Sequence, residues 1–166
     1  MTDTISATGG CLCAGVRFKA SGPVHFNLVC HCRMCQRASG SAFMGLMFVD
    51  TANVTVTKGA TKTYGSSTSG IRHFCGDCGS SLFFERDSKA LHGILAGALD
   101  DPDLFKPSMH ICISAKQDWL ALDGVIPEYE EKPEGMTPTG SYDAVAGKLV
   151  EADKRSEASL IKGDQE

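Results

Sequence analysis

The sequence predicts a mainly β domain built from short antiparallel strands. Short runs of β-branched or alternating apolar residues recur between Val16 and Leu122, and glycine, proline and serine residues separate them. Seven of the eight cysteines fall in C-x-C or C-x-x-C groups, which are typical of metal ligands. The strongest helical pattern lies after this region. We therefore expect a β domain that bound metal stabilises.

Length and charge indicate one domain followed by a tail. Of the 166 residues, we assign 1–129 to the domain and 130–166 to an acidic tail. Basic and acidic residues balance in the domain, so the whole excess of negative charge lies in the tail. A neutral domain with an acidic tail argues against nucleic acid as a partner.

Hydropathy and the first residues indicate a cytoplasmic protein without a membrane partner. No apolar run approaches the length of a membrane span, and the polar residues 1–8 lack a signal-peptide pattern. In a reducing compartment, clustered cysteines favour metal ligation over disulfides.

The first half of the domain shows five strand patterns. Residues 36–41 are small and polar and indicate a helical turn or a loop, and Ser21-Gly22-Pro23 indicates a turn. Residues 54–57 and 61–64 flank Lys58-Gly59-Ala60 and predict a hairpin. The expected strands are 16–20, 26–29, 43–49, 54–57 and 61–64.

The second half of the domain continues the pattern up to a proline-rich boundary at 127–138. A loop is expected at 66–70 and an acidic, proline-bounded turn at 100–107. In the tail, residues 143–162 are consistent with one C-terminal helix, docked or loose. The expected strands are 71–74, 82–85, 91–98, 109–114 and, as a last short one, 119–122.

The spacing of the cysteines suggests two metal sites. Cys30, Cys32 and Cys35 form a C-x-C-x-x-C run whose three sulfurs can converge on one ion and leave a position open, as in a catalytic zinc site. Four further thiols can close a tetrahedron, as in a structural zinc site. Spacing also allows Cys11 and Cys13 to pair instead with two thiols of the C-x-C-x-x-C run. The four are Cys11, Cys13, Cys75 and Cys78.

Other chemistry-bearing residues are less clear from the sequence. Cys112 is either a fourth ligand of the three-thiol set or a buried apolar thiol between Ile111 and Ile113, and we favour the second reading. The five histidines are expected to be structural or solvent-facing. Arg33 and Arg37 are four residues apart around Cys35 and could bind substrate carboxylates, or be solvated surface charges.

Several segments together resemble the glutathione-dependent formaldehyde-activating enzyme family, also called the GFA or CENP-V domain. The resemblance covers residues 9 to 130. The matching segments are 9–18, 30–37, 73–79, 99–102 and 110–111.

This resemblance implies an Mss4-like, zinc-bound β domain with two zinc ions per chain. It implies a structural zinc at Cys11, Cys13, Cys75 and Cys78, and a catalytic zinc at the C-x-C-x-x-C thiols. It also implies carbon–sulfur lyase activity like that of S-hydroxymethylglutathione synthase, with glutathione or a similar small thiol as partner and an aldehyde such as formaldehyde.

The residues do not decide which substrate group would bind the metal, nor whether the protein is a catalyst. Either the thiol or the aldehyde oxygen could bind the open position, and three thiolates make the metal a weak electrophile, which favours the thiol. The principal alternative is a zinc-stabilised binding module without catalysis, and iron could replace zinc. The sequence singles out no general base. It is compatible with a homo-oligomer.

Overall fold

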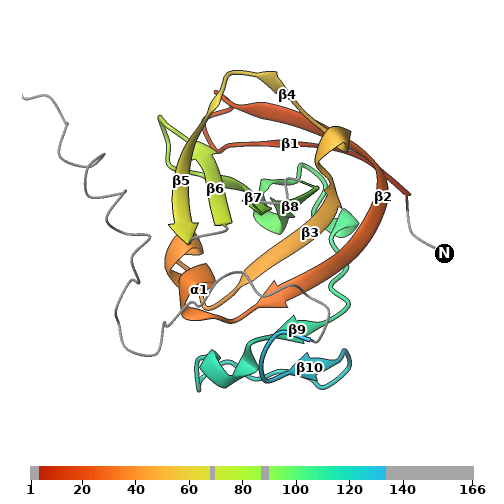
Figure 1. The fold of residues 1–166 in the computed structure, drawn as a ribbon, viewed down its shortest axis with the longest axis vertical. Helices are drawn as coiled ribbons and strands as arrows, with labels where there is room; N and C mark the ends of the chain where they lie inside the picture. Colours follow the sequence, from red (N-terminus) through yellow and green to blue (C-terminus); the bar gives the residue numbers. More distant parts are fainter. Residues whose placement is uncertain (1–3, 68–69, 87–89, 134–166) are drawn as a thin grey trace, which may run out of the picture.

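The computed structural model describes residues 4–67, 70–86 and 90–133, and these form a mainly β structure (Figure 1). One α-helix, α1 (Arg33–Ser39), and four short 3-10 turns accompany the strands. The strands are β1 (Thr4–Gly10), β2 (Arg17–Cys30), β3 (Met44–Asp50), β4 (Val54–Lys58), β5 (Thr61–Ser67), β6 (Gly70–Cys75), β7 (Ser81–Arg86), β8 (Leu91–Leu95), β9 (His110–Ile111) and β10 (Glu128–Tyr129).

The long strand β2 organises the sheet. Its first half pairs with β1 on one side and β4 on the other, and its second half pairs with β3 and β9. From β3 the order continues through β8, β7 and β6 to β5, with antiparallel neighbours. A shift in register between Val24 and Phe26 separates the two halves. Such irregularities bend strands, and in Figure 1 β2 curves around the molecule so that β1 and β4 lie over the remaining strands.

The core lies between the two parts of this curved sheet. Phe18 of β2 and Phe83 of β7 meet edge to face with ring centroids 4.8 Å apart, and both are almost fully buried. Removing either ring would leave a large cavity, and such substitutions cost about 3–5 kcal/mol. Met47, Leu82 and Ile94 fill the same core. This packing fixes the positions at which β2 and β6 end, where cysteines follow.

Helix α1 begins and ends on residues with clear local roles. Cys32 is its N-cap, and the Cys32 sulfur accepts a hydrogen bond from the backbone N–H of Cys35. Gly40 ends the helix in the left-handed region at φ 63°, where its N–H bonds the carbonyl of Gln36. The predicted helical turn at 36–41 is therefore part of a helix that starts earlier, directly inside the cysteine run.

Most predicted strands are confirmed, but the predicted turn at Ser21-Gly22-Pro23 is wrong. These residues continue β2 and pair with β1, where Thr4 lies opposite Pro23. The β1 strand was not predicted, although Ile5 and Ala7 alternate with exposed residues along it. A neighbouring strand on this edge satisfies the backbone around Gly22 and Pro23, so these residues need not form a turn.

The predicted hairpin between residues 54–57 and 61–64 is also wrong. Both strands exist, but β4 pairs with β2 and β5 pairs with β6. Gly59 adopts φ +67°, and a Cβ atom there would lie 2.2 Å from the carbonyl oxygen of Gly15. The backbone contact with Gly15 directs the chain away from a hairpin, from one part of the sheet to the other.

The last predicted elements are shorter than expected or lie elsewhere. Residues 91–98 form β8 and then a 3-10 turn, and the 109–114 strand is reduced to the two residues of β9. Residues 119–122 are not a strand; β10 instead pairs with β9 in parallel. The predicted C-terminal helix lies outside the described residues.

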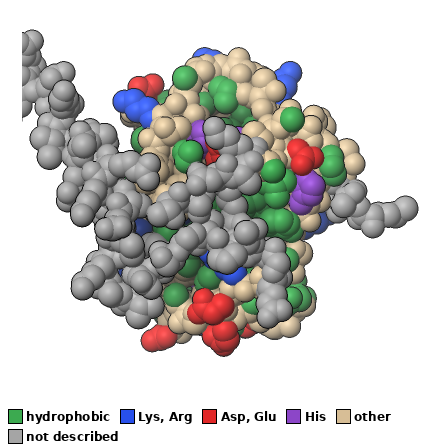
Figure 2. Space-filling view, in the orientation of Figure 1, with side chains coloured by type: hydrophobic (Ala, Val, Ile, Leu, Met, Phe, Trp, Pro, Cys, Tyr) green, Lys and Arg blue, Asp and Glu red, His purple; other side chains and the backbone are tan. Residues whose placement is uncertain are grey.

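Figure 2 shows the molecule as a space-filling view in the orientation of Figure 1. Acidic side chains gather at the end of the molecule that carries β9 and β10, where Glu128, Glu130 and Glu131 are exposed. Within the described ranges, the structure has no helix with the length and apolar character that crossing a membrane requires.

Candidate metal centres

The structure brings Cys11, Cys13, Cys75 and Cys78 together. The first two lie between β1 and β2, and the others lie at the end of β6 and in the turn that leads to β7. All four sulfur atoms lie within 4.8 Å of one another. We call these residues the four-thiol set. It joins segments that are about sixty residues apart in the chain.

The distances within the four-thiol set fit one tetrahedral metal ion. The sulfur of Cys13 lies 3.5 Å from that of Cys11 and 3.8 Å from that of Cys75. Four sulfurs that each lie about 2.3 Å from one zinc ion are about 3.8 Å apart. The set therefore suits a thiophilic ion such as zinc without rearrangement.

Hydrogen bonds to sulfur favour the thiolate form of two members of this set, Cys11 and Cys78. The backbone N–H of Val16 donates to the sulfur of Cys11 at 3.1 Å and lowers its pKa. The side chain and backbone of Ser80 hydrogen-bond Cys78 and lower its pKa to about 5. Metal ligation requires deprotonated sulfur, so these contacts prepare the set for an ion.

Cys30, Cys32 and Cys35 form a second cluster, the three-thiol set. Cys30 ends β2, Cys32 caps helix α1 and Cys35 lies in its first turn. Their sulfur atoms also lie within 4.8 Å of one another, and no fourth His, Cys, Asp or Glu from the described part of the chain joins the group. Three converging thiols can hold an ion and leave a position for another ligand.

The thiols of this set share negative charge unequally when no metal is bound. Hydrogen bonds with Cys30 and Cys35 lower the pKa of Cys32 to about 2. At Cys35, the hydrogen bond with Cys30 lowers the pKa, but the contact with Cys32 and burial outweigh it and raise the pKa to about 12. One thiolate, centred on Cys32, is therefore stabilised by its two neighbours.

Arg72 of β6 supplies positive charge to the three-thiol set, and sequence reasoning did not single it out. Its guanidinium is buried, with Nη2 3.9 Å from the sulfur of Cys35 and Nη1 3.5 Å from that of Met44. It also lies over the ring of Phe84, 5.2 Å from the centroid. A buried arginine needs such partners, because an unpaired charge in the core is costly.

His31, which lies between two members of the three-thiol set, pairs with the half-buried His110. Nε2 of His31 is 2.9 Å from Nδ1 of His110, and His31 is fully buried. Burial, with the nearby His110 and Lys116, lowers the pKa of His31 to about 4, so His31 is neutral at pH 7. The amide of Gln36 donates to the carbonyls of His31 and Ala115. These contacts hold the cysteine run against the segment that follows β9.

Cys112 is buried, as its apolar reading predicted, but it also contacts the three-thiol set. Interaction with the Cys112 thiol, and then with Cys32 and Cys35, raises the pKa of Cys30. Cys112 adopts φ 58° at the start of the 3-10 turn Ile113–Ala115, an uncommon conformation for this residue type. The described geometry thus places a fourth thiol next to one member of the set.

The two arginines proposed for substrate binding differ in their surroundings. Arg33 is half-buried and donates to the side-chain oxygen of Gln36. Arg37, one helical turn later, is exposed, and its side chain forms no hydrogen bond or ion pair with described residues. Of the two arginines, Arg37 is thus the one with an exposed side chain.

Comparison with known proteins shows a family match over most of the described chain. The model of the family described as "Glutathione-dependent formaldehyde-activating enzyme" matches residues 6–115. A putative glutathione-dependent formaldehyde-activating enzyme of Halomonas elongata is 31% identical over 128 residues, which cover 69% of this chain and 80% of the relative.

Two other similarities are narrower. An uncharacterized lyase of Schizosaccharomyces pombe is 33% identical over 76 residues, 46% of this chain and 55% of that protein. The crystal structure of a Rhodobacter sphaeroides protein shares the fold, with a TM-score of 0.50 and 20% identity over 73% of this chain and 98% of the other.

Proposed function

Because the chain belongs to the glutathione-dependent formaldehyde-activating enzyme family, we propose that it is a zinc-dependent, lyase-type enzyme that joins a small thiol to an aldehyde. Glutathione and formaldehyde are the first pair to test, since the family is named after them. The product of that pair is S-hydroxymethylglutathione.

The convergence of three cysteines without a fourth described ligand is the observation that most supports this proposal. The three-thiol set would hold the zinc ion at which the reaction occurs, and the four-thiol set would hold a second zinc with a structural role. At an open position, bound zinc favours the deprotonated form of a substrate thiol.

The proposed reaction needs no oxidant or reductant. The thiol loses its proton, its sulfur forms a bond with the carbonyl carbon, and the carbon–oxygen double bond becomes a single bond to an oxygen that takes up a proton. Arg72 would offset the negative charge of the thiolates that line the site. Arg37, with Arg33 one turn earlier, would attract the substrate carboxylates.

Product formation tests the proposal. We expect the full-length protein to form S-hydroxymethylglutathione from glutathione and formaldehyde faster than buffer alone, as followed by NMR. Cys32→Ser is expected to lose this acceleration and about one zinc ion per chain. Arg37→Gln is expected to raise KM for glutathione about tenfold, because one charge-assisted contact is lost, and to keep kcat. A rate equal to that of buffer would overturn the proposal.

A second candidate function is a zinc-stabilised binding module without catalysis. The observation that favours it is the contact between Cys112 and Cys30, which places a fourth thiol beside the three-thiol set. Cys112→Ala separates the two candidates. The enzyme proposal expects unchanged zinc content and activity, whereas a closed four-ligand site would lose its ion.

A further inference from the structure

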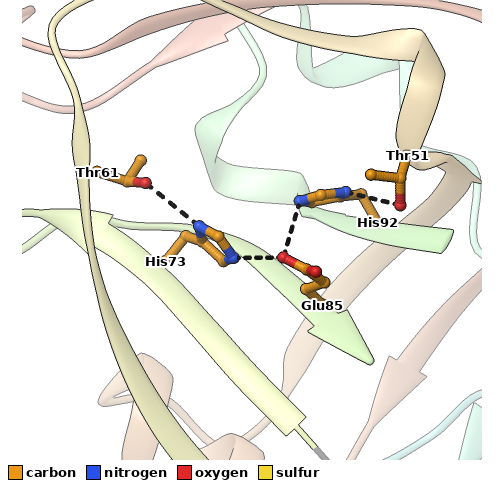
Figure 3. Close-up of polar contacts among 5 residues, drawn as sticks. All are labelled: Thr51, Thr61, His73, Glu85 and His92. Carbon is orange, nitrogen blue, oxygen red and sulfur yellow. Dashed lines mark hydrogen bonds and ion pairs between the residues drawn. The ribbon is translucent and has the colours of Figure 1, made fainter. Parts of the chain in front are cut away.

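Three side chains from adjacent strands converge on the face of the sheet opposite Arg72. They are His73 of β6, Glu85 of β7 and His92 of β8, and Figure 3 shows both imidazole rings directed toward the carboxylate. One ligand atom from each lies within 4.8 Å of the other two. The pairing of Glu85 with His92 and of His73 with Phe83 places all three on one face.

The distances in this cluster are compatible with a shared ion, and the shorter of the two is also that of an ordinary hydrogen bond. Oε2 of Glu85 lies 2.9 Å from Nε2 of His73 and 3.7 Å from Nε2 of His92. The second distance is too long for a hydrogen bond. Nitrogen and oxygen ligands about 2.1 Å from one ion lie roughly 3.0–3.4 Å apart, and the two observed distances bracket this range.

Threonine hydroxyls orient both rings. Oγ1 of Thr61 lies 3.2 Å from Nδ1 of His73, and Oγ1 of Thr51 lies 3.0 Å from Nδ1 of His92 (Figure 3). When each Nδ1–H donates to its threonine, both Nε2 lone pairs face the Glu85 carboxylate. Three acceptors that face one another repel unless a cation lies between them.

The three side chains of the cluster are mostly buried, but each remains partly exposed to solvent. The side chains of His73, Glu85 and His92 are 16%, 12% and 12% exposed, respectively. The ring of Phe83 packs edge-on against both imidazoles. The ion pairs that Glu85 forms with described residues are both to histidine, so a half-buried carboxylate has no permanently charged partner there.

We propose that His73, Glu85 and His92 bind one divalent transition-metal ion through the two Nε2 atoms and Glu85 Oε2. Two imidazoles and one carboxylate suit Zn²⁺, Fe²⁺, Co²⁺ or Ni²⁺ better than Mg²⁺ or Ca²⁺. Three protein ligands leave at least one position for water or another ligand. This site shares no ligand with either thiol set and does not depend on the proposed lyase activity.

Zinc titration of the full-length protein as purified tests the site. By calorimetry, the wild type is expected to bind one more equivalent of Zn²⁺ than Glu85→Gln, which keeps the side-chain shape but removes the charge. His92→Asn is expected to lose the same equivalent. The matched control is His25→Asn: His25 and Asp50 form an exposed 3.0 Å pair without a third ligand, so this variant is expected to bind zinc like the wild type.

Histidine NMR on the wild type provides a readout that needs no variant to fold. We expect added Zn²⁺ to shift the Nε2 resonances of His73 and His92 and to leave those of His25 in place. The proposal is overturned if these Nε2 resonances do not respond to Zn²⁺. It is also overturned if folded Glu85→Gln binds as many equivalents as the wild type, which would make the cluster a hydrogen-bonded network only.

Discussion

The buried guanidinium of Arg72 links the sheet to the charge of the three-thiol set. It contacts the sulfurs of Cys35 and Met44 and the ring of Phe84, and its Nε has no hydrogen-bond partner in the described structure. A buried cation with so few oxygen partners is best explained by nearby negative charge, and the thiolates supply it.

We predict that Arg72→Met weakens zinc binding at the three-thiol set about tenfold or more, as expected when a group that supports the ligands is lost. Competition with a chromogenic chelator measures this affinity. The zinc affinity of Arg72→Lys is expected to lie between those of the wild type and Arg72→Met, because lysine keeps the charge but not the planar contact with Phe84. The four-thiol set serves as an internal control. Equal zinc affinity in Arg72→Met and wild type would contradict the prediction.

At the residue scale, the spacing of cysteines in the sequence predicted the three-thiol set. A cluster whose members lie far apart in the sequence depends on strand pairing and was not predicted. The C-x-C-x-x-C run specifies its own convergence, since Cys30, Cys32 and Cys35 span a strand end and the first turn of a helix. His73, Glu85 and His92 meet only through the register of three strands, so no local pattern indicates them. Alternation along β6 would have identified this face only once that register was known.

At the element scale, a polar clamp holds the turn after β8 against β1 and β2. The Asp100 carboxylate accepts hydrogen bonds from Arg17 and from the hydroxyl of Thr8, the latter at 2.6 Å. The backbone N–H of Asp100 also donates to the carbonyl of Thr8. This clamp lies next to Gly10, directly before the four-thiol set.

We predict that Asp100→Asn lowers the melting temperature at pH 7, by roughly 2–4 °C, because the clamp is partly exposed. Hydrogen bonds from Arg17 and Thr8 lower the pKa of Asp100 below its usual value of 3.8. A lowered pKa gives stability that is present above this usual value and is lost as the pH falls through the folded-state pKa.

Thermal melts between pH 7 and pH 3 check this dependence. The difference between wild type and Asp100→Asn is expected to stay constant down to about pH 4 and to shrink below it. Zinc release in acid affects both chains, so only their difference is compared. A difference that is equal at pH 7 and pH 3 would contradict the assignment.

Element identity was easier to predict than element pairing. Short apolar or strand-like runs predicted β3, β6 and β7 closely. The two strands around Gly59 looked like a hairpin, yet β4 and β5 belong to different parts of the sheet. The deciding contact is between Gly59 and the backbone of Gly15, which lies far away in the sequence.

At the scale of the whole molecule, the two thiol sets bring together segments that the sheet order alone would not hold. The four-thiol set links the β1–β2 connection to the end of β6, and the three-thiol set links β2 to α1 beside Cys112. The sequence indicated both sets. It could not indicate that β9 and β10 add in parallel to the end of β2, because two-residue strands carry no periodic signal.

The end of the described chain is hydrogen-bonded to the segment around Cys112, the thiol next to Cys30. The backbone N–H of Cys112 donates to the carbonyl of Glu131 at 3.4 Å, and that of Ser114 donates to the carbonyl of Glu130 at 3.3 Å. The hydroxyl of Ser114 also donates to the Glu131 carboxylate at 2.9 Å. These bonds lie beyond residue 129, where the sequence suggested that the domain ends.

We predict that a chain truncated after residue 133 keeps the melting temperature and zinc content of the full chain, since all the contacts described above lie within residues 4–133. Truncation after residue 129 removes three hydrogen bonds, each worth about 1 kcal/mol, and is expected to lower the melting temperature by about 5 °C or more. Differential scanning calorimetry with metal analysis compares the three chains. Equal melting of both truncated chains would show that residues 130–133 do not support the site, and a large loss in the longer one would assign a structural role to the tail.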